Sequence, residues 1–199
     1  VMDILLSGIG IIITSPIMLI IAIAVKAYDR GPVFYFQDRL TLGGKPFKIC
    51  KFRSMCVDSE KNGARLASKH DSRITPVGHV LRNLHLDELP QLFNVFKGDM
   101  SLVGPRPERE SIMLEYEKEL PEFYYRLKVK AGLTGYAQVY GKYNTTPYDK
   151  LKLDLFYIEN YSFLLDIKLI FMTVKIFFQK EVSEGVDDRQ VNALKDSGK

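Results

Sequence analysis

Apolar residues are concentrated in one run near the start of the chain. Between Ile4 and Val25 the sequence has 22 residues without a charge, and Lys26 and Arg30 follow them. At about 1.5 Å per residue, a helix of this length crosses the ~30 Å hydrocarbon core of a bilayer. Ser15-Pro16 lies near the midpoint, where proline removes a backbone hydrogen bond and bends a helix. The pattern predicts a membrane segment that either crosses the bilayer or turns within it and returns to the same face.

Two short runs after this segment have the composition of β-strands. They are Val33–Asp38 and Phe47–Phe52, and Gly43-Gly44 between them provides a turn, so a β-hairpin is predicted. Strand alternation places Lys51 and Arg53 on one face. Two cations on one face suit a phosphate group, although cations also protect an exposed edge strand from aggregation.

Four later segments have a helical pattern. They are Pro76–Phe96, which Pro90 interrupts, then Pro107–Leu120, Thr146–Asn160 and Ser162–Lys180. The apolar face of the first suits either a protein core or a membrane interface. The last is apolar but includes charged residues in its interior, which argues against crossing a membrane. It is predicted to be an amphipathic helix at the interface or against the first membrane segment.

The remaining segments are polar or rich in glycine. Val57–Thr75 is predicted to be a surface loop, and the glycines of residues 132–141 predict a loop and a short strand. We assign residues 1–28 to the membrane, 29–185 to a cytoplasmic domain and 186–199 to a polar tail. The chain begins at Val1 without a starting Met, so we expect further residues upstream.

Composition narrows the class of protein. In 199 residues, 46% hydrophobic content with 26% charged residues excludes a disordered chain. The net charge of +4 fits an anionic membrane surface or a phosphorylated substrate. Nucleic acid fits the charge too, but the sequence has no nucleic-acid-binding motif. Cys50 and Cys56 match no common zinc or redox spacing, which indicates a reducing environment.

The segment Leu81–Pro107, LRNLHLDELPQLFNVFKGDMSLVGPRP, contains the candidate chemistry. It sets Asp87 and Glu88 side by side between Arg82 and Arg106. One carboxylate can attack phosphorus, a second can hold Mg²⁺, and guanidinium groups can neutralise phosphate oxygens. A lone Asp-Glu pair is more often a solvated helix start, so the interpretation depends on the surrounding motifs.

Those motifs resemble the bacterial sugar transferase family, the monotopic phosphoglycosyl transferases. The resemblance covers nearly the whole chain and is carried by FYFQDR, KPFKICKFRSM, the Leu81–Pro107 segment, GLTGYAQVYG and LDLFYIENYSFLLDIK. It implies an α+β, mostly helical fold: a re-entrant membrane helix broken at Ser15-Pro16, a compact cytoplasmic domain with a small β-hairpin, and interfacial amphipathic helices.

The resemblance also implies roles for individual residues. Asp87 is the expected nucleophile, which becomes a phosphosugar-bearing aspartate, and Glu88 is expected to hold Mg²⁺. Basic positions of the family's active site match Lys51, Arg53 and Arg82, while Arg106 is expected to contact the nucleotide sugar. Two further positions depart from the family's pattern: Lys142, expected to bind phosphate, stands where many members have Arg, and Tyr136 stands where many have Trp. Asp154 and Asp166 match frequent acidic positions.

The reaction that follows is transfer of a sugar 1-phosphate from a UDP-sugar to undecaprenyl phosphate, with release of UMP and ping-pong kinetics. Expected partners are these two substrates and membrane lipids, not nucleic acid, and a homo-oligomer is left open. The expected location is the bacterial inner membrane, with the catalytic domain on the cytoplasmic face. Glucose or galactose 1-phosphate is expected, with an N-acetylated hexosamine as the other candidate. The alternative is a membrane-anchored binding or regulatory protein of the same fold.

Overall fold

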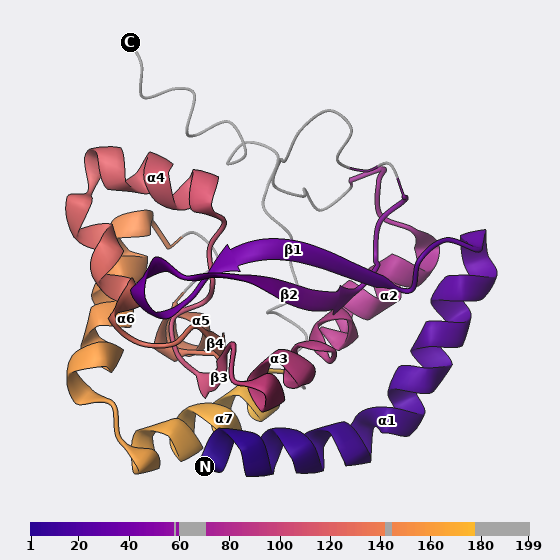
Figure 1. Cartoon of the computed structure of the whole chain (residues 1–199), viewed down its shortest axis with the longest axis horizontal. Coiled ribbons are helices and arrows are strands. Elements are labelled where there is room, and N and C mark those ends of the chain that lie inside the picture. Colours follow the sequence, from indigo (N-terminus) through magenta and orange to yellow (C-terminus); the bar gives the residue numbers. More distant parts are fainter. Residues whose placement is uncertain (58, 60–70, 142–144, 178–199) are drawn as a thin grey trace.

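The computed structural model describes residues 1–57, 59, 71–141 and 145–177. The chain is mostly helical, with two small two-stranded sheets. Figure 1 shows a β-hairpin across the middle of the molecule, with the long helix α1 running along one side of it and α4 and α6 at the far end. Most of the predicted surface loop and the predicted polar tail lie outside the described residues.

The apolar run forms one helix, α1 (Met2–Asp29), and not two separated half-helices. Figure 1 shows this helix bent about halfway along its length. Pro16 lies inside α1 and cannot donate to the carbonyl of Ile12, four residues earlier. The Ser15 hydroxyl donates to that carbonyl instead, at 2.8 Å. The Ser-Pro pair therefore bends the helix while keeping its backbone hydrogen-bonded, and α1 is long and apolar enough to cross a membrane.

The predicted β-hairpin is confirmed. Strands β1 (Phe34–Leu40) and β2 (Pro46–Phe52) pair antiparallel in a register that sets Phe34 opposite Phe52. The turn contains Gly43 and Gly44 at φ 69° and 75°, a backbone region that favours glycine.

The predicted helical segment 76–96 is interrupted over residues 84–90, a longer break than the one expected at Pro90. It comprises α2 (Pro76–Asn83), a 3-10 turn (Leu86–Glu88) and α3 (Gln91–Lys97). Thr75 caps α2 by accepting a hydrogen bond from the backbone N–H of Gly78 at 2.9 Å. Helix α3 lies against α1, and a Cβ built on Gly10 of α1 would be 3.3 Å from Leu92 of α3.

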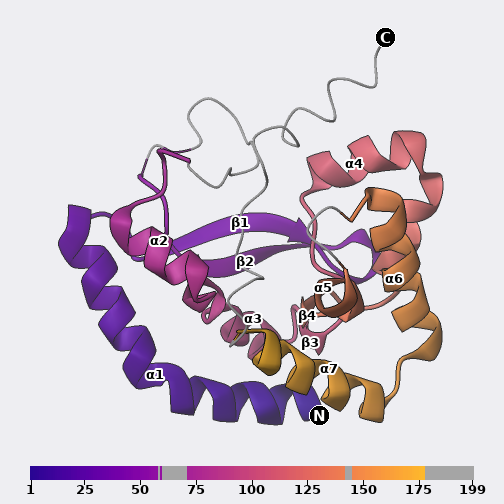
Figure 2. The ribbon, with the colours of Figure 1, turned by 180° about the vertical axis from the view of Figure 1, so that it is seen from behind.

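The C-terminal half surrounds a short parallel pair, β3 (Ser101–Val103) with β4 (Gly132–Thr134). Its helices are α4 (Glu110–Glu119), α5 (Tyr136–Tyr140), α6 (Pro147–Asn160) and α7 (Phe163–Phe177). Helix α5 lies between α6 and α7, as Figure 2 shows. The predicted helix from Pro107 begins three residues later, at Glu110.

The largest apolar cluster fills the space between the hairpin, α3, β3 and α7, and a second joins α1 to β2 and α2. Much apolar surface is nevertheless exposed. Exposed apolar side chains occur on α1, α3 and α7, and include Ile12, Ile13, Leu19, Ile20, Phe93, Phe96, Leu164 and Phe171.

Candidate functional site

The two candidate carboxylates lie in the 3-10 turn between α2 and α3. His85, the residue before the turn, is left-handed at φ 52°, which redirects the chain out of α2. The leucines on either side of the pair, Leu86 and Leu89, pack into the apolar cluster shared with α1 and β2. This packing fixes the turn and leaves Asp87 and Glu88 half-buried.

Glu88 is paired with two cations from distant parts of the chain. One carboxylate oxygen, Oε1, accepts from Lys51 Nζ of β2 and from Arg106 Nη2 of the loop after β3, both at 2.7 Å. Burial alone would raise the pKa of Glu88, but the charges of Arg106 and Lys51 and their hydrogen bonds outweigh it. The pKa is therefore held well below its usual range, and Glu88 is a carboxylate at neutral pH.

Asp87 responds differently to the same surroundings. Burial and the neighbouring charge of Glu88 raise its pKa, while Lys51, Arg82 and His85 act in the opposite direction. The expected cations are therefore close enough to act on Asp87, but they do not set the direction of the shift. A less hydrated carboxylate beside cations is suited to attack an anionic phosphate.

The structure gives Arg53 other partners. Its guanidinium binds both carboxylate oxygens of Asp29 at 2.5 Å, and its Nε donates to the carbonyl of Pro32 at 2.6 Å. Arg53 therefore connects β2 to the C-terminal end of α1. The Lys51 ammonium lies beside Glu88, whereas the Arg53 guanidinium is bound at the C-terminal end of α1.

The loop that carries Arg106 rests on a buried ion network that the sequence does not predict. Arg126 binds Asp154 through Nε and Nη2, at 3.0 and 2.6 Å, and lies 3.4 Å from Glu108. Lys150 also pairs with Glu108. Arg126 and Asp154 are almost fully buried, so each needs the other's charge. Asp154, which the family resemblance gives as an acidic position, is thus the partner of Arg126. The sequence does not indicate that these residues pair with one another.

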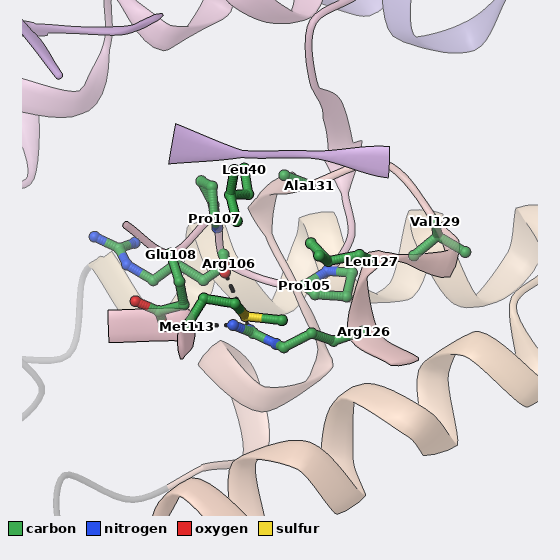
Figure 3. Close-up of a pocket in the computed structure, with 10 residues that line it drawn as sticks. All are labelled: Leu40, Pro105, Arg106, Pro107, Glu108, Met113, Arg126, Leu127, Val129 and Ala131. Atoms are coloured by element: carbon green, nitrogen blue, oxygen red, sulfur yellow. Dashed lines mark hydrogen bonds and ion pairs between the residues drawn. The ribbon is translucent and has the colours of Figure 1, made fainter. Parts of the chain in front are cut away.

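A small cavity lies beside this network and shares Arg106 with the candidate site (Figure 3). Its volume is about 10 Å³, enough for roughly one water molecule. A nucleotide sugar cannot fit there. The open surface around Asp87, Glu88 and the Arg106 guanidinium, which is nearly half exposed, is the better candidate for a substrate.

Other predicted positions have structural partners or lie elsewhere. The Tyr136 ring packs against Tyr140 and Phe156, and Asp166 accepts a hydrogen bond from the Tyr157 hydroxyl at 2.8 Å. Lys142 lies outside the described residues. Cys50 and Cys56 are free thiols.

Among the residues that the structure describes, no group of three His, Cys, Asp or Glu side chains is arranged to hold a metal ion. The adjacent carboxylates of Asp87 and Glu88 offer hard oxygen ligands. Mg²⁺ is commonly held by one or two carboxylates together with substrate phosphates and water. The two carboxylates are therefore chemically suited to hold a magnesium ion.

Comparison with known proteins gives the family. A family model described as bacterial sugar transferase matches residues 1–180. The chain is 45% identical over 177 residues to the UDP-N-acetylgalactosamine-undecaprenyl-phosphate N-acetylgalactosaminephosphotransferase of Aeromonas hydrophila, an alignment that covers 87% of this chain and 42% of that protein. It is also 45% identical over 177 residues to the UDP-glucose:undecaprenyl-phosphate glucose-1-phosphate transferase of Klebsiella pneumoniae, covering 86% and 38%.

A protein of the same name from Caulobacter vibrioides is 37% identical over 179 residues, covering 87% of this chain and 67% of that protein. The chain spans about two fifths of the length of the Aeromonas and Klebsiella relatives. The family model, in contrast, matches it from Val1, just before α1, to beyond the end of α7. The chain belongs to the bacterial sugar transferase family.

Proposed function

We propose that this chain transfers a sugar 1-phosphate from a UDP-sugar to undecaprenyl phosphate. The observation that carries the proposal is the Asp87-Glu88 turn. Lys51 and Arg106 keep the Glu88 carboxylate ionised. The Asp87 carboxylate has a raised pKa and also interacts with the charge of Lys51. The names of the Aeromonas and Klebsiella relatives describe this class of reaction.

The proposed reaction has two steps. A carboxylate oxygen of Asp87 attacks the β-phosphorus of the UDP-sugar, the bond from that phosphorus to the bridging oxygen breaks, and UMP leaves with the electron pair. A phosphate oxygen of undecaprenyl phosphate then attacks the same phosphorus. Asp87 leaves as a free carboxylate, and the product is the undecaprenyl diphosphosugar.

The surrounding cations supply the charge stabilisation that phosphoryl transfer requires. Arg82 and Lys51 act on Asp87, and Arg106 pairs with Glu88 while remaining nearly half exposed. In this proposal Arg106 meets the diphosphate of the donor, and Lys142 meets phosphate from a segment outside the described residues. Glu88 would hold Mg²⁺, which when bound neutralises phosphate oxygens.

We further propose that α1 is re-entrant, so that both its ends face the cytoplasm. At the start of α1, Asp3 accepts hydrogen bonds from the Ser101 hydroxyl at 3.1 Å and from the Leu102 N–H at 3.0 Å. At its end, Asp29 is held by Arg53. Both ends are thus bound to the same small domain, whereas a helix that crossed the bilayer would separate them by about 30 Å of hydrocarbon.

The exposed apolar side chains support the same placement. They extend from α1 to Phe93 and Phe96 of α3 and to Leu164 and Phe171 of α7. Exposed apolar side chains on these three helices suit the boundary between headgroups and acyl chains. The proposal places α3 and α7 in the interface of the bacterial inner membrane, and the Asp87-Glu88 turn at the level of lipid phosphates.

Release of UMP by the detergent-solubilised protein tests the function. UDP-glucose, UDP-galactose, UDP-N-acetylglucosamine and UDP-N-acetylgalactosamine are supplied separately with Mg²⁺ and undecaprenyl phosphate, because relatives of equal identity are named for different sugars. With the accepted donor alone, intact-protein mass spectrometry should detect one added sugar phosphate. Asp87→Asn should remove this adduct and lower turnover roughly a thousandfold or more.

Asp38→Asn is the matched control, because Asp38 is an exposed carboxylate of β1. It should keep both the adduct and the turnover. Full UMP release by Asp87→Asn would exclude the covalent mechanism. Donor binding without UMP release from any of the four sugars would favour a non-catalytic binding protein.

A further inference from the structure

The loop that contains Arg106 is hydrogen-bonded through the backbone carbonyls of residues 105–108. Each of the four consecutive carbonyls from Pro105 to Glu108 accepts a hydrogen bond, and the donors come from three elements: β4, the 3-10 segment Pro121–Lys128 and β1. In chain order, the donors are Gly132 N at 2.9 Å, Arg126 Nη2 at 3.0 Å, Arg39 Nη1 at 3.0 Å and Leu40 N at 3.0 Å. The two prolines additionally fix their own φ angles. Four bonded carbonyls and two fixed φ angles leave the backbone at Arg106 little freedom to move.

Among these donors, Arg126 is the one that binds the carbonyl of Arg106 itself. Figure 3 shows its guanidinium facing the Arg106 carbonyl and Glu108. The same guanidinium also donates to Asp154 of α6. It lies over the Phe123 ring, with its Cζ 4.8 Å from the ring centroid. Burial in a well-packed site leaves Arg126 little freedom to move. The Arg106 guanidinium extends the other way, to Glu88 at 2.7 Å.

We infer that Arg126 is a positioning residue, which orients Arg106 toward Glu88 and the donor diphosphate without touching the substrate. This inference rests on the proposed function. A planar guanidinium can bind Asp154 and the Arg106 carbonyl at once, whereas an ammonium is a point charge on a flexible stem. Arg126→Lys therefore keeps a cation beside Asp154 and loses the simultaneous hold on the Arg106 backbone.

The first measurement is the KM of the UDP-sugar for Arg126→Lys. Losing one hydrogen bond from a charged donor should cost about tenfold in kcat/KM, expressed mainly in KM, because the donor's contact with Arg106 weakens. Lys128→Met is the matched control, since Lys128 lies in the same 3-10 segment but is exposed. It should leave KM and kcat unchanged.

A double-mutant cycle separates positioning from general support of the fold. The dissociation constant of the UDP-sugar is measured for the Asp87→Asn protein, for its Arg126→Lys and Arg106→Ala derivatives, and for the derivative with both changes. If Arg126 acts through Arg106, Arg126→Lys weakens binding about tenfold alone but less than about twofold when Arg106 is already Ala. Equal losses in both backgrounds, or none in either, would overturn the inference.

Hydrogen exchange gives a readout that does not depend on catalysis. Amide hydrogens in peptides covering residues 102–113 should exchange faster in Arg126→Lys than in wild type. In Lys128→Met they should exchange at the wild-type rate. Unaltered exchange in Arg126→Lys would overturn the inference even in a protein without transferase activity. A wild type that releases no UMP would instead overturn the proposed function, so the two failures are distinguishable.

Discussion

The Asp29–Arg53 ion pair makes a sharp prediction, because sequence and structure assign Arg53 different partners. The family resemblance places Arg53 among the phosphate-binding cations, whereas its guanidinium is bidentate on Asp29. Arg53→Met removes the cation, and Asp29→Asn removes only the charge of its partner. If the pair serves to hold α1 to β2, both variants should lose stability and neither should change the affinity for the UDP-sugar.

The expected loss follows from the exposure of the two side chains. Breaking a fully buried ion pair by removing one member costs about 3–5 kcal/mol. Here the Arg53 side chain is 7% exposed and that of Asp29 is 26% exposed, so part of the charge stays hydrated. We expect about 2 kcal/mol for Arg53→Met, and about 1 kcal/mol for Asp29→Asn, which keeps a hydrogen-bond acceptor.

For a chain of this size, 2 kcal/mol lowers Tm by about 4–8 °C. Chemical denaturation and thermal melting in detergent measure the two losses, and the double variant should lose less than their sum, since the two side chains act as one unit. A donor-binding assay completes the test. Normal donor binding by Asp29→Asn together with a large loss in Arg53→Met would refute the structural role and restore Arg53 to the phosphate site.

Three further predictions test other parts of the structure. Glu88 has a lowered pKa, so its contribution to stability is complete above its ordinary pKa and is lost as the pH falls toward its folded value; Glu88→Gln should flatten the acid limb of the stability curve measured by denaturation. Gly78→Ala should destabilise by more than 2 kcal/mol, because a Cβ there would lie 1.9 Å from the Ser54 carbonyl oxygen; chemical denaturation checks this, and stability like wild type would contradict the packing. Pro16→Ala should straighten α1, and a cysteine introduced near the N-terminus should then lose labelling from the side that labels the catalytic domain; unchanged labelling would show that the proline does not set topology.

Local signals in the sequence were sufficient for most of the secondary structure. The alternation before and after Gly43-Gly44 predicts the hairpin, because both strands and their turn lie within twenty residues. Pro90 marks the break before α3, since proline cannot donate in a helix interior. Pro107 misleads, because it looks like a first helical residue but belongs to a loop held by Arg39 and Leu40.

The candidate site was predictable only as far as motifs carried it. The family resemblance assigns Lys51, Glu88 and Arg106 to one active site. Lys51 and Arg106 are 37 and 18 residues from Glu88 in the sequence, and both bind its Oε1. The support for the site was not predictable. Arg126 bonds to Asp154, 28 residues away, and to a backbone carbonyl 20 residues away, and neither periodicity nor composition encodes such a pairing.

The packing around the Asp87-Glu88 turn also fixes the position of that turn relative to α1. Leu86 and Leu89, on either side of the carboxylates, pack in the cluster formed with α1, and α3 starts two residues later and lies along the same helix. Helix α1 is in turn fixed at both ends, by Asp3 and by Asp29. Direct side-chain packing therefore joins the apolar helix to the turn that contains the carboxylates. Whatever depth α1 adopts in a bilayer therefore determines the depth of Asp87. Substitutions at the two ends of α1 should change the kinetics with undecaprenyl phosphate before they change UMP release from the UDP-sugar in the first step.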